Sequence, residues 1–175
     1  MTHNPSSSIA AKPVDRAAFL LAMRAVPGAV AIIASSDGKE MTGMAATAWN
    51  SLCADPPTIL VCINLGASVH AVIHCARRFT VNLVPSNAAE TVAIFSAQRG
   101  LSGRDRFVDG QWSSSAAGQP MLNSAVVSFE CDLSADHVHA THSIFIGQVG
   151  ETRSNLESEA LLYFNGAYGR SVSLD

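Results

Sequence analysis

The alternation of apolar and polar residues along the chain predicts a protein built mainly from short strands. Runs rich in β-branched residues recur through most of the sequence, and the pair Asp37-Gly38 marks a tight hairpin turn after the first of them. The last two runs alternate as antiparallel strands do. Strands are expected at residues 29–36, 41–49, 58–64, 78–84, 125–154 and 160–172.

Three segments instead carry apolar residues at helical spacing. The first covers residues 14–26 and ends at a Pro-Gly pair, and the second is a short amphipathic helix at residues 66–77. The third covers residues 87–98, with Asn87 expected as its N-cap. Because helices do not follow each strand, the order favours an antiparallel β-barrel with a few helices over a doubly wound parallel sheet.

The length of 175 residues suits one domain with its own core. Residues 1–13 are polar and Ser-rich, so we expect a flexible leader there, followed by a single domain over residues 14–175. Residues 100–120 are rich in glycine and serine and have little periodicity. We expect them to form a long surface loop, a kind of segment that often carries function.

Composition narrows the classes of function. A hydrophobic fraction of 48% and a charged fraction of 14% indicate a compact globular protein, and a net charge of −3 without a basic run argues against nucleic acid binding. Neither a signal peptide nor a membrane-spanning apolar run is visible, so no membrane association and a cytoplasmic location are expected. The four cysteines form no Cys-x-x-Cys pair, and we expect buried thiols rather than a zinc site or disulfides.

Histidines form the most conspicuous local cluster, at residues 136–142. His137 and His139 would share one face of a strand and so resemble a metal-chelating pair, but the next acidic residue is Glu151, twelve positions after His139. We therefore expect no metal. A second pair, His70 and His74, lacks the glutamate of a zinc-protease helix and is expected at the surface or at an interface.

A neutral, hydroxyl-bearing segment, residues 43–57, has no charge before Asp55. The polar side chains of this segment and of the next strand suit the amide edge of an isoalloxazine ring, and an arginine of residues 100–120 suits a phosphate. They equally suit strand ends and turns, so both interpretations stay open. The candidates are Thr47, Asn50, Ser51, Asn64 and Ser68, with Arg104 or Arg106 for the phosphate.

Six motifs in order resemble the flavin reductase-like, FMN-binding split-barrel family, namely "GMAATAWNSLCADPPTILVCINLGASVHAVI", "RFTVNLV", "RDRF", "GQPMLNSAVVSFECDL", "ATHSIFIGQV" and "LLYFNGAYGR". The variety that the chain is most similar to is the small reductase component of two-component flavin monooxygenases, of the 4-hydroxyphenylacetate 3-monooxygenase type. The resemblance implies a Greek-key split barrel, a homodimer, and reduction of FMN or FAD by NADH or NADPH. The reduced flavin would pass to a separate flavin-dependent oxygenase. The sequence has no evident Arg or Lys pair that would bind the 2′-phosphate of NADPH, and this absence favours NADH.

The resemblance also implies roles for particular residues. His142 would position the nicotinamide. Trp49 departs from the smaller residues common at its position in the family, and would either stack near the flavin or pack against a partner subunit. Two other activities stay open for such a barrel: a non-catalytic flavin or heme-binding module, and a flavoenzyme that oxidises its own substrate with tightly bound FMN. The implied flavin and nicotinamide contacts are Thr47, Ala48, Trp49, Asn50, Ser51, Cys62, Ile63, Asn64, Ser68, Phe79, Arg104 or Arg106, and Tyr168.

Overall fold

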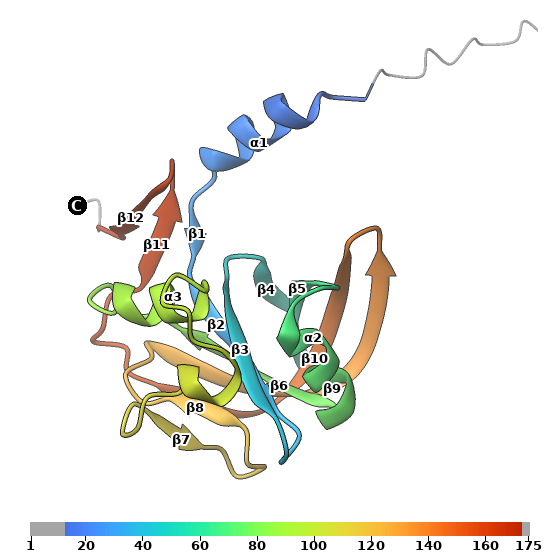
Figure 1. The fold of residues 1–175 in the computed structure, drawn as a ribbon, viewed down its shortest axis with the longest axis vertical. Coiled ribbons are helices and arrows are strands. Elements are labelled where there is room, and N and C mark those ends of the chain that lie inside the picture. Colours follow the sequence, from blue (N-terminus) through green and yellow to red (C-terminus); the bar gives the residue numbers. More distant parts are fainter. Residues whose placement is uncertain (1–12, 173–175) are drawn as a thin grey trace, which may run out of the picture.

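The computed structural model describes residues 13–172 and has one large curved sheet, three α-helices and two smaller sheets within that range (Figure 1). The large sheet has the strand order β3-β2-β6-β9-β10-β5-β4, and its pairs are antiparallel. The mainly β fold with a few helices is therefore confirmed. Its strands are β2 (Ala31–Ser36), β3 (Met41–Ala46), β4 (Trp49–Ala54), β5 (Pro57–Asn64), β6 (Arg78–Leu83), β9 (Val127–His139) and β10 (His142–Ser154).

The two edge strands of this sheet are consecutive in the chain. β3 ends at Ala46 and β4 begins at Trp49, so only Thr47 and Ala48 join the two edges. Since adjacent Cα atoms lie about 3.8 Å apart, the edges must come close, and the seven strands have to curl into a barrel. β3 and β4 are not neighbours in the strand order, so the barrel stays split at this seam.

The barrel is filled by one apolar cluster, and a second apolar cluster lies outside it. The first contains Ile33, Val61, Phe79 and Phe145, each 0% exposed. Gly147 allows this packing, because a Cβ there would lie 2.6 Å from Cε1 of Phe79. The second cluster packs α3 (Ala89–Phe95) against the outer face of β2.

The helices differ in how much they bury. α2 (Ser68–Ala76) buries Val69, Val72 and Ile73, whereas α1 (Arg16–Arg24), capped by the carboxylate of Asp15, buries no residue and projects away from the sheets (Figure 1). None of the helices in residues 13–172 is long and apolar enough to cross a membrane.

The third helix does not begin where the sequence predicted. Its N-cap is Ala88, without a side-chain hydrogen bond, so the expected cap at Asn87 is wrong. The helix is also shorter than expected and is held instead by burial, since five of its seven residues lie in the core. Glu90 points outward to Arg99, whose guanidinium donates two hydrogen bonds of 2.6 and 2.7 Å and lowers the pKa of the Glu90 carboxyl.

Residues 100–120 are not the structureless loop that the sequence predicted. They contain a 3-10 turn (η1, Gly103–Arg106) and β7 (Trp112–Ser114), which pairs with β8 (Pro120–Leu122). Phe107 and Trp112 order this segment, because their rings pack against each other and against Phe95, with centroids 4.9–5.4 Å apart. Aromatic packing against a distant segment therefore orders residues 100–120, although their sequence has little periodicity.

A small third sheet lies beside the seam and combines the two ends of the described chain. It has the order β1 (Gly28–Ala29), β11 (Leu161–Phe164) and β12 (Ala167–Arg170). The β11–β12 turn is Asn165-Gly166, and both residues have positive φ angles (51° and 80°), as a two-residue hairpin requires.

The expectation of buried thiols is wrong for three of the four cysteines. Cys53 and Cys75 are exposed, Cys62 is half-buried, and Cys131 alone is buried. Burial raises the pKa of the Cys131 thiol to about 12, so it stays protonated and packs as an apolar side chain.

Candidate functional site

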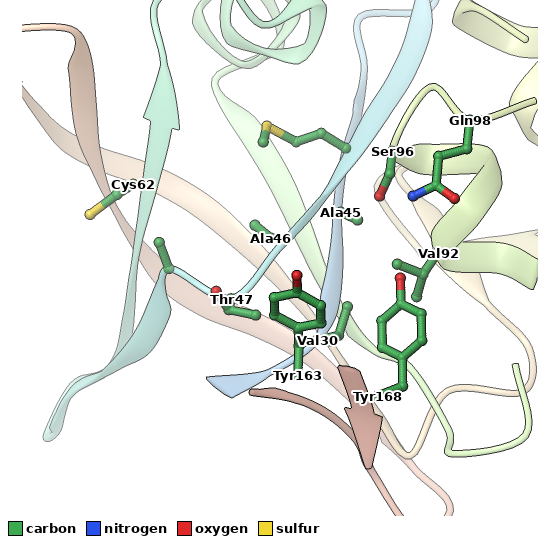
Figure 2. A pocket seen from close by; sticks show the side chains of 12 residues that line it. Val30, Ala45, Ala46, Thr47, Cys62, Val92, Ser96, Gln98, Tyr163 and Tyr168 are labelled. Carbon is green, nitrogen blue, oxygen red and sulfur yellow. The ribbon is translucent and has the colours of Figure 1, made fainter. Parts of the chain in front are cut away.

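A pocket of about 390 Å³ opens at the seam of the barrel, between the end of β3, the end of α3 and the β11–β12 hairpin (Figure 2). This volume falls within the range typical of small-molecule sites. Five separate parts of the chain contribute, and none of the side chains that line it is charged. The lining residues are Val30, Met44, Ala45, Ala46, Thr47, Ala48, Cys62, Val92, Ser96, Gln98, Tyr163 and Tyr168.

The linker between the two barrel edges forms one wall of the pocket. Thr47 presents its hydroxyl there, and the amide N–H of Cys62 donates to the carbonyl oxygen of Ala48 over 2.8 Å. β1 runs close behind this wall, since a Cβ at Gly28 would lie only 2.8 Å from the Cβ of Thr47. The absence of a side chain at Gly28 therefore determines where Thr47 lies.

The opposite wall follows α3. The helix ends at Phe95, and Ala97 then adopts a left-handed backbone conformation with φ of 60°. That conformation costs an alanine about 1–2 kcal/mol, and here it turns the chain so that Ser96 and Gln98 both line the pocket (Figure 2). The amide of Gln98 and the hydroxyl of Ser96 are polar groups that the sequence analysis missed.

Two tyrosines of the β11–β12 hairpin complete the pocket. Tyr163 and Tyr168 are cross-strand partners with ring centroids 5.6 Å apart, and their rings stand side by side in Figure 2. Tyr168 was expected at the site, but Tyr163 was not. The sequence did contain the signal, because a two-residue turn at Asn165-Gly166 fixes the register that places these residues opposite each other.

The structure brings only some of the expected site residues to this pocket, namely Thr47, Ala48, Cys62 and Tyr168. Trp49 and Ser51 line a different groove, against Phe129 and Val149. The indole N–H of Trp49 donates to the carbonyl oxygen of Ala29 over 2.9 Å, so Trp49 joins β4 to β1 within the same subunit. Asn50 is exposed on β4 and its side chain accepts from the N–H of Ser51.

Other expected residues have structural contacts of their own. Ile63 and Phe79 are 0% exposed inside the barrel, and the hydroxyl of Ser68 lies 2.9 Å from that of Thr42. Arg106 donates to the carbonyl oxygens of Gly43 and Leu101, which ties η1 to β3. The structure thus brings none of these side chains to the pocket.

Arg104 lies elsewhere as well. It lines a separate pocket with Phe107 and Trp112, beside the β7–β8 hairpin. Neither arginine that the sequence proposed for a phosphate lines the seam pocket. The reason is that the segment folds back on α3 through its aromatic residues and carries both arginines with it.

His142 lies just beyond the pocket, at the start of β10. It is exposed and opposite Asn64 on β5, two residues along from Cys62 on the same face of the strand. From strand geometry, the Cα atoms of His142 and Cys62 are about 8 Å apart. The hydroxyl of Thr141 lies 2.9 Å from Nδ1 of His142, and the N–H of Leu65 donates to the carbonyl oxygen of Thr141.

The histidine cluster of β9 has no metal-binding arrangement in the structure. His137 and His139 are exposed, and among residues 13–172 no three His, Cys, Asp or Glu side chains converge to hold an ion. The seam pocket instead combines apolar side chains with the hydroxyl and amide groups of Thr47, Ser96 and Gln98. Such surroundings fit an uncharged planar ring with a hydrogen-bonding edge, as in a flavin.

Comparison with known proteins places the chain in a family. The family model for the flavin reductase like domain matches residues 23–171. The chain is 33% identical over 156 residues to an FMN reductase (NADH) RutF of Stutzerimonas stutzeri (strain A1501), covering 89% of this chain and 88% of the relative. It is also 33% identical over 147 residues to the FMN reductase (NADH) RutF of Agrobacterium fabrum, covering 84% and 83%.

Solved structures agree with this assignment. A flavin reductase homologue from Haemophilus somnus 129PT superposes with a TM-score of 0.85 at 30% identity, covering 90% of this chain and all of that one. Flavin reductase PheA2, at 24% identity, shares the fold with a TM-score of 0.82 and covers 91% and 100%. The family predicted from the order of motifs is confirmed, and the chain belongs to the flavin reductase like domain family.

Proposed function

We propose that this protein is an NADH-dependent flavin reductase that reduces FMN or FAD and releases the reduced flavin to a separate flavin-dependent oxygenase. The observation that carries the proposal is the uncharged seam pocket with His142 about 8 Å beyond Cys62. It offers one space for an isoalloxazine ring and an exposed face beside it for a nicotinamide. The relatives named FMN reductase (NADH) support the same activity.

The reaction moves a hydride from NADH to the flavin, which also takes up one proton, and leaves NAD⁺. Side chains of the pocket bind and orient, because this chemistry needs no protein nucleophile. Val30 and Val92 supply apolar contact, and Thr47 and Gln98 supply hydrogen bonds for the amide edge of the ring. Stacking the two rings at about 3–3.5 Å is the main requirement for transfer.

His142 serves on the nicotinamide side in this proposal. Its exposed ring and its hydrogen bond to Thr141 suit a residue that seats the pyridine nucleotide. The proposal runs the backbone of Cys62, Ile63 and Asn64 along the flavin, because β5 leads from Cys62 in the pocket to Asn64, the strand partner of His142. Phe79 and Arg106 do not touch the flavin in this proposal. Phe79 supports the site by packing in the barrel core, and Arg106 supports it by its hydrogen bond to Gly43 on β3.

The proposal includes a homodimer, supported by the exposed apolar surface of α1. Leu21 is 72% exposed, and no residue of the helix is buried in the subunit. An isolated apolar helix is unfavourable in water, so a second copy of the chain is the proposed cover. The exposed apolar residues on and beside α1 are Val14, Phe19, Leu20, Leu21, Met23 and Val26.

Replacing Leu21 by glutamate tests the dimer. Size-exclusion chromatography with light scattering is expected to give a dimer for the parent protein and a monomer for Leu21→Glu. Arg16→Glu, on the same helix but at a polar position, is the matched control and is expected to remain dimeric. The proposed role of α1 would be contradicted if the parent protein were a monomer, or if both the parent and Leu21→Glu were dimers.

The proposal also includes a partner oxygenase, which takes up the reduced flavin released from the open pocket. A related structure, at 23% identity, is BorF, the flavin reductase component of a bacterial two-component tryptophan halogenase. Since NADH is regenerated in the cytoplasm, a reductase that consumes it is proposed to work there.

The activity is tested by adding NADH with FMN or FAD to the purified protein and following the NADH absorbance band. Oxidation of NADH that saturates with added flavin supports the proposal. A yellow protein that ignores NADH indicates a binding module, and a yellow protein whose flavin is reduced only by an organic substrate indicates a different flavoenzyme. NADPH in place of NADH measures the nucleotide preference.

A further inference from the structure

Beneath α2 lies a cluster of ionisable and aromatic side chains that the reaction does not use. His70 and His74, one helical turn apart, stand with ring centroids 4.8 Å from each other and 5.1 Å each from Phe145. Nε2 of His70 lies 2.8 Å from the hydroxyl of Ser143, and Nε2 of His74 lies 3.9 Å from Asp136 on β9. The two histidines thus have different polar partners.

His70 is half-buried. Its partner Ser143 is 0% exposed. A buried hydroxyl needs a hydrogen-bonding partner, and the bond to His70 meets that need across 73 positions of sequence. This contact fixes α2 to the first residues of β10.

Ser143 directly follows His142, so the bond lies next to the proposed nicotinamide site. The turn that carries His142 is held from both sides: the N–H of Leu65 donates to the carbonyl oxygen of Thr141 before it, and His70 bonds to Ser143 after it. Within the turn, Ala140 has a left-handed φ of 50°. A turn that includes such a residue needs external contacts to keep one conformation.

We propose that His70 is a positioning residue: by holding Ser143, it keeps the turn and the ring of His142 in the orientation that receives the nicotinamide. This inference rests on the proposed function for its kinetic consequence, whereas the orientation of His142 is a property of the protein alone. His74 packs in the same cluster without touching Ser143 and so has no such role.

The surroundings of His70 favour its neutral form. Burial lowers the pKa of His70, the neighbouring His74 lowers it further, and Asp136 opposes the shift. His74 lies on the other side of the cluster, with Nε2 3.9 Å from the carboxylate of Asp136. With a neutral ring, Nε2 of His70 can either donate to or accept from the hydroxyl of Ser143.

Four variants test the proposal: His70→Leu, Ser143→Ala, His70→Gln and the matched control His74→Gln. His70→Leu and Ser143→Ala are expected to raise the KM for NADH roughly three- to tenfold, the range that losing one hydrogen bond produces, with kcat and the KM for flavin little changed. The double variant should be no worse than either single one. His70→Gln, whose amide reaches toward Ser143, should restore most of the loss, and His74→Gln should behave as the parent.

A second measurement does not depend on turnover. The ring signals of His142 in ¹H–¹³C NMR spectra are expected to shift in His70→Leu and in Ser143→Ala, and to stay in place in His74→Gln. Unchanged His142 signals in folded His70→Leu and Ser143→Ala proteins would overturn the proposal, as would additive effects in the double variant. If the parent protein oxidises no NADH, the proposed function fails, and the NMR comparison still decides whether His70 positions His142.

Discussion

Replacing Gly28 by alanine is expected to weaken flavin binding by moving two walls of the seam pocket. An ideal Cβ at Gly28 lies 2.8 Å from Cβ and 3.1 Å from Cγ2 of Thr47, whereas carbon atoms in contact prefer about 3.5–4.0 Å. Relief requires a displacement of about 1 Å, which Thr47 and the paired strand residue Tyr163 must share. Both residues line the pocket.

A displacement of that size at a binding site costs as much as a hundredfold in rate, so the KM for FMN should rise between roughly tenfold and a hundredfold. Stability should change little, because Thr47 is exposed and can shift without opening a cavity. The assay is NADH oxidation at saturating NADH with FMN varied, and circular dichroism verifies the fold.

The matched control is Gly150→Ala, on β10. The added Cβ there meets only Oδ2 of Asp132, at 3.8 Å, which is an ordinary contact, and the residue does not line the seam pocket. Its KM for FMN should equal that of the parent. An unchanged KM in a folded Gly28→Ala protein would refute the reasoning, because the crowding at Thr47 would then have no consequence for flavin.

Three further outcomes are expected. Gly147→Ala should lower the free energy of unfolding by about 1–3 kcal/mol, which corresponds to a melting temperature lower by about 2–12 °C. The reason is that the added Cβ would lie 2.6–2.7 Å from atoms of Phe79 and Cys131, both 0% exposed. Equal melting temperatures for this variant and Gly150→Ala would contradict the prediction. His142→Ala should raise the KM for NADH far more than it lowers kcat, and loss of turnover at an unchanged KM would count against the nicotinamide role. Because burial lowers the pKa of His70 in the folded protein, the unfolded chain binds the proton first as the pH falls, so stability should decline below about pH 6.5, and denaturant titrations across this range should show a weaker decline in His70→Gln.

The structure also explains why the pocket carries no catalytic dyad. Its lining is neutral, and the charged groups nearby are engaged elsewhere: Arg99 with Glu90, and Arg106 with the carbonyl oxygens of Gly43 and Leu101. A neutral, open site suits a protein that binds its flavin only for the duration of one reduction. Binding and orientation are then the main contributions of the side chains.

Much of the fold was accessible from the sequence because it depends on local chemistry. Alternation predicted the strands, and the turn at Asp37-Gly38 is where β2 and β3 join as a hairpin, with Asp37 accepting hydrogen bonds from the N–H groups of Lys39 and Glu40. The order of six motifs identified the family, and "CIN" and "AATAW" contain pocket residues such as Cys62 and Thr47. These features depend on neighbours within a few positions of the chain.

The tertiary structure alone decided which of these segments meet. The pocket joins Thr47 to Gln98 and to Tyr163, residues more than fifty positions apart, and periodicity says nothing of such pairs. The tertiary structure also places Arg104 away from the seam and brings His70 next to Ser143. The physical reason is that residue type and spacing indicate which face of a helix or strand is buried. Which side chain from another segment it then contacts depends on how the sheet curls and on where the loops pack.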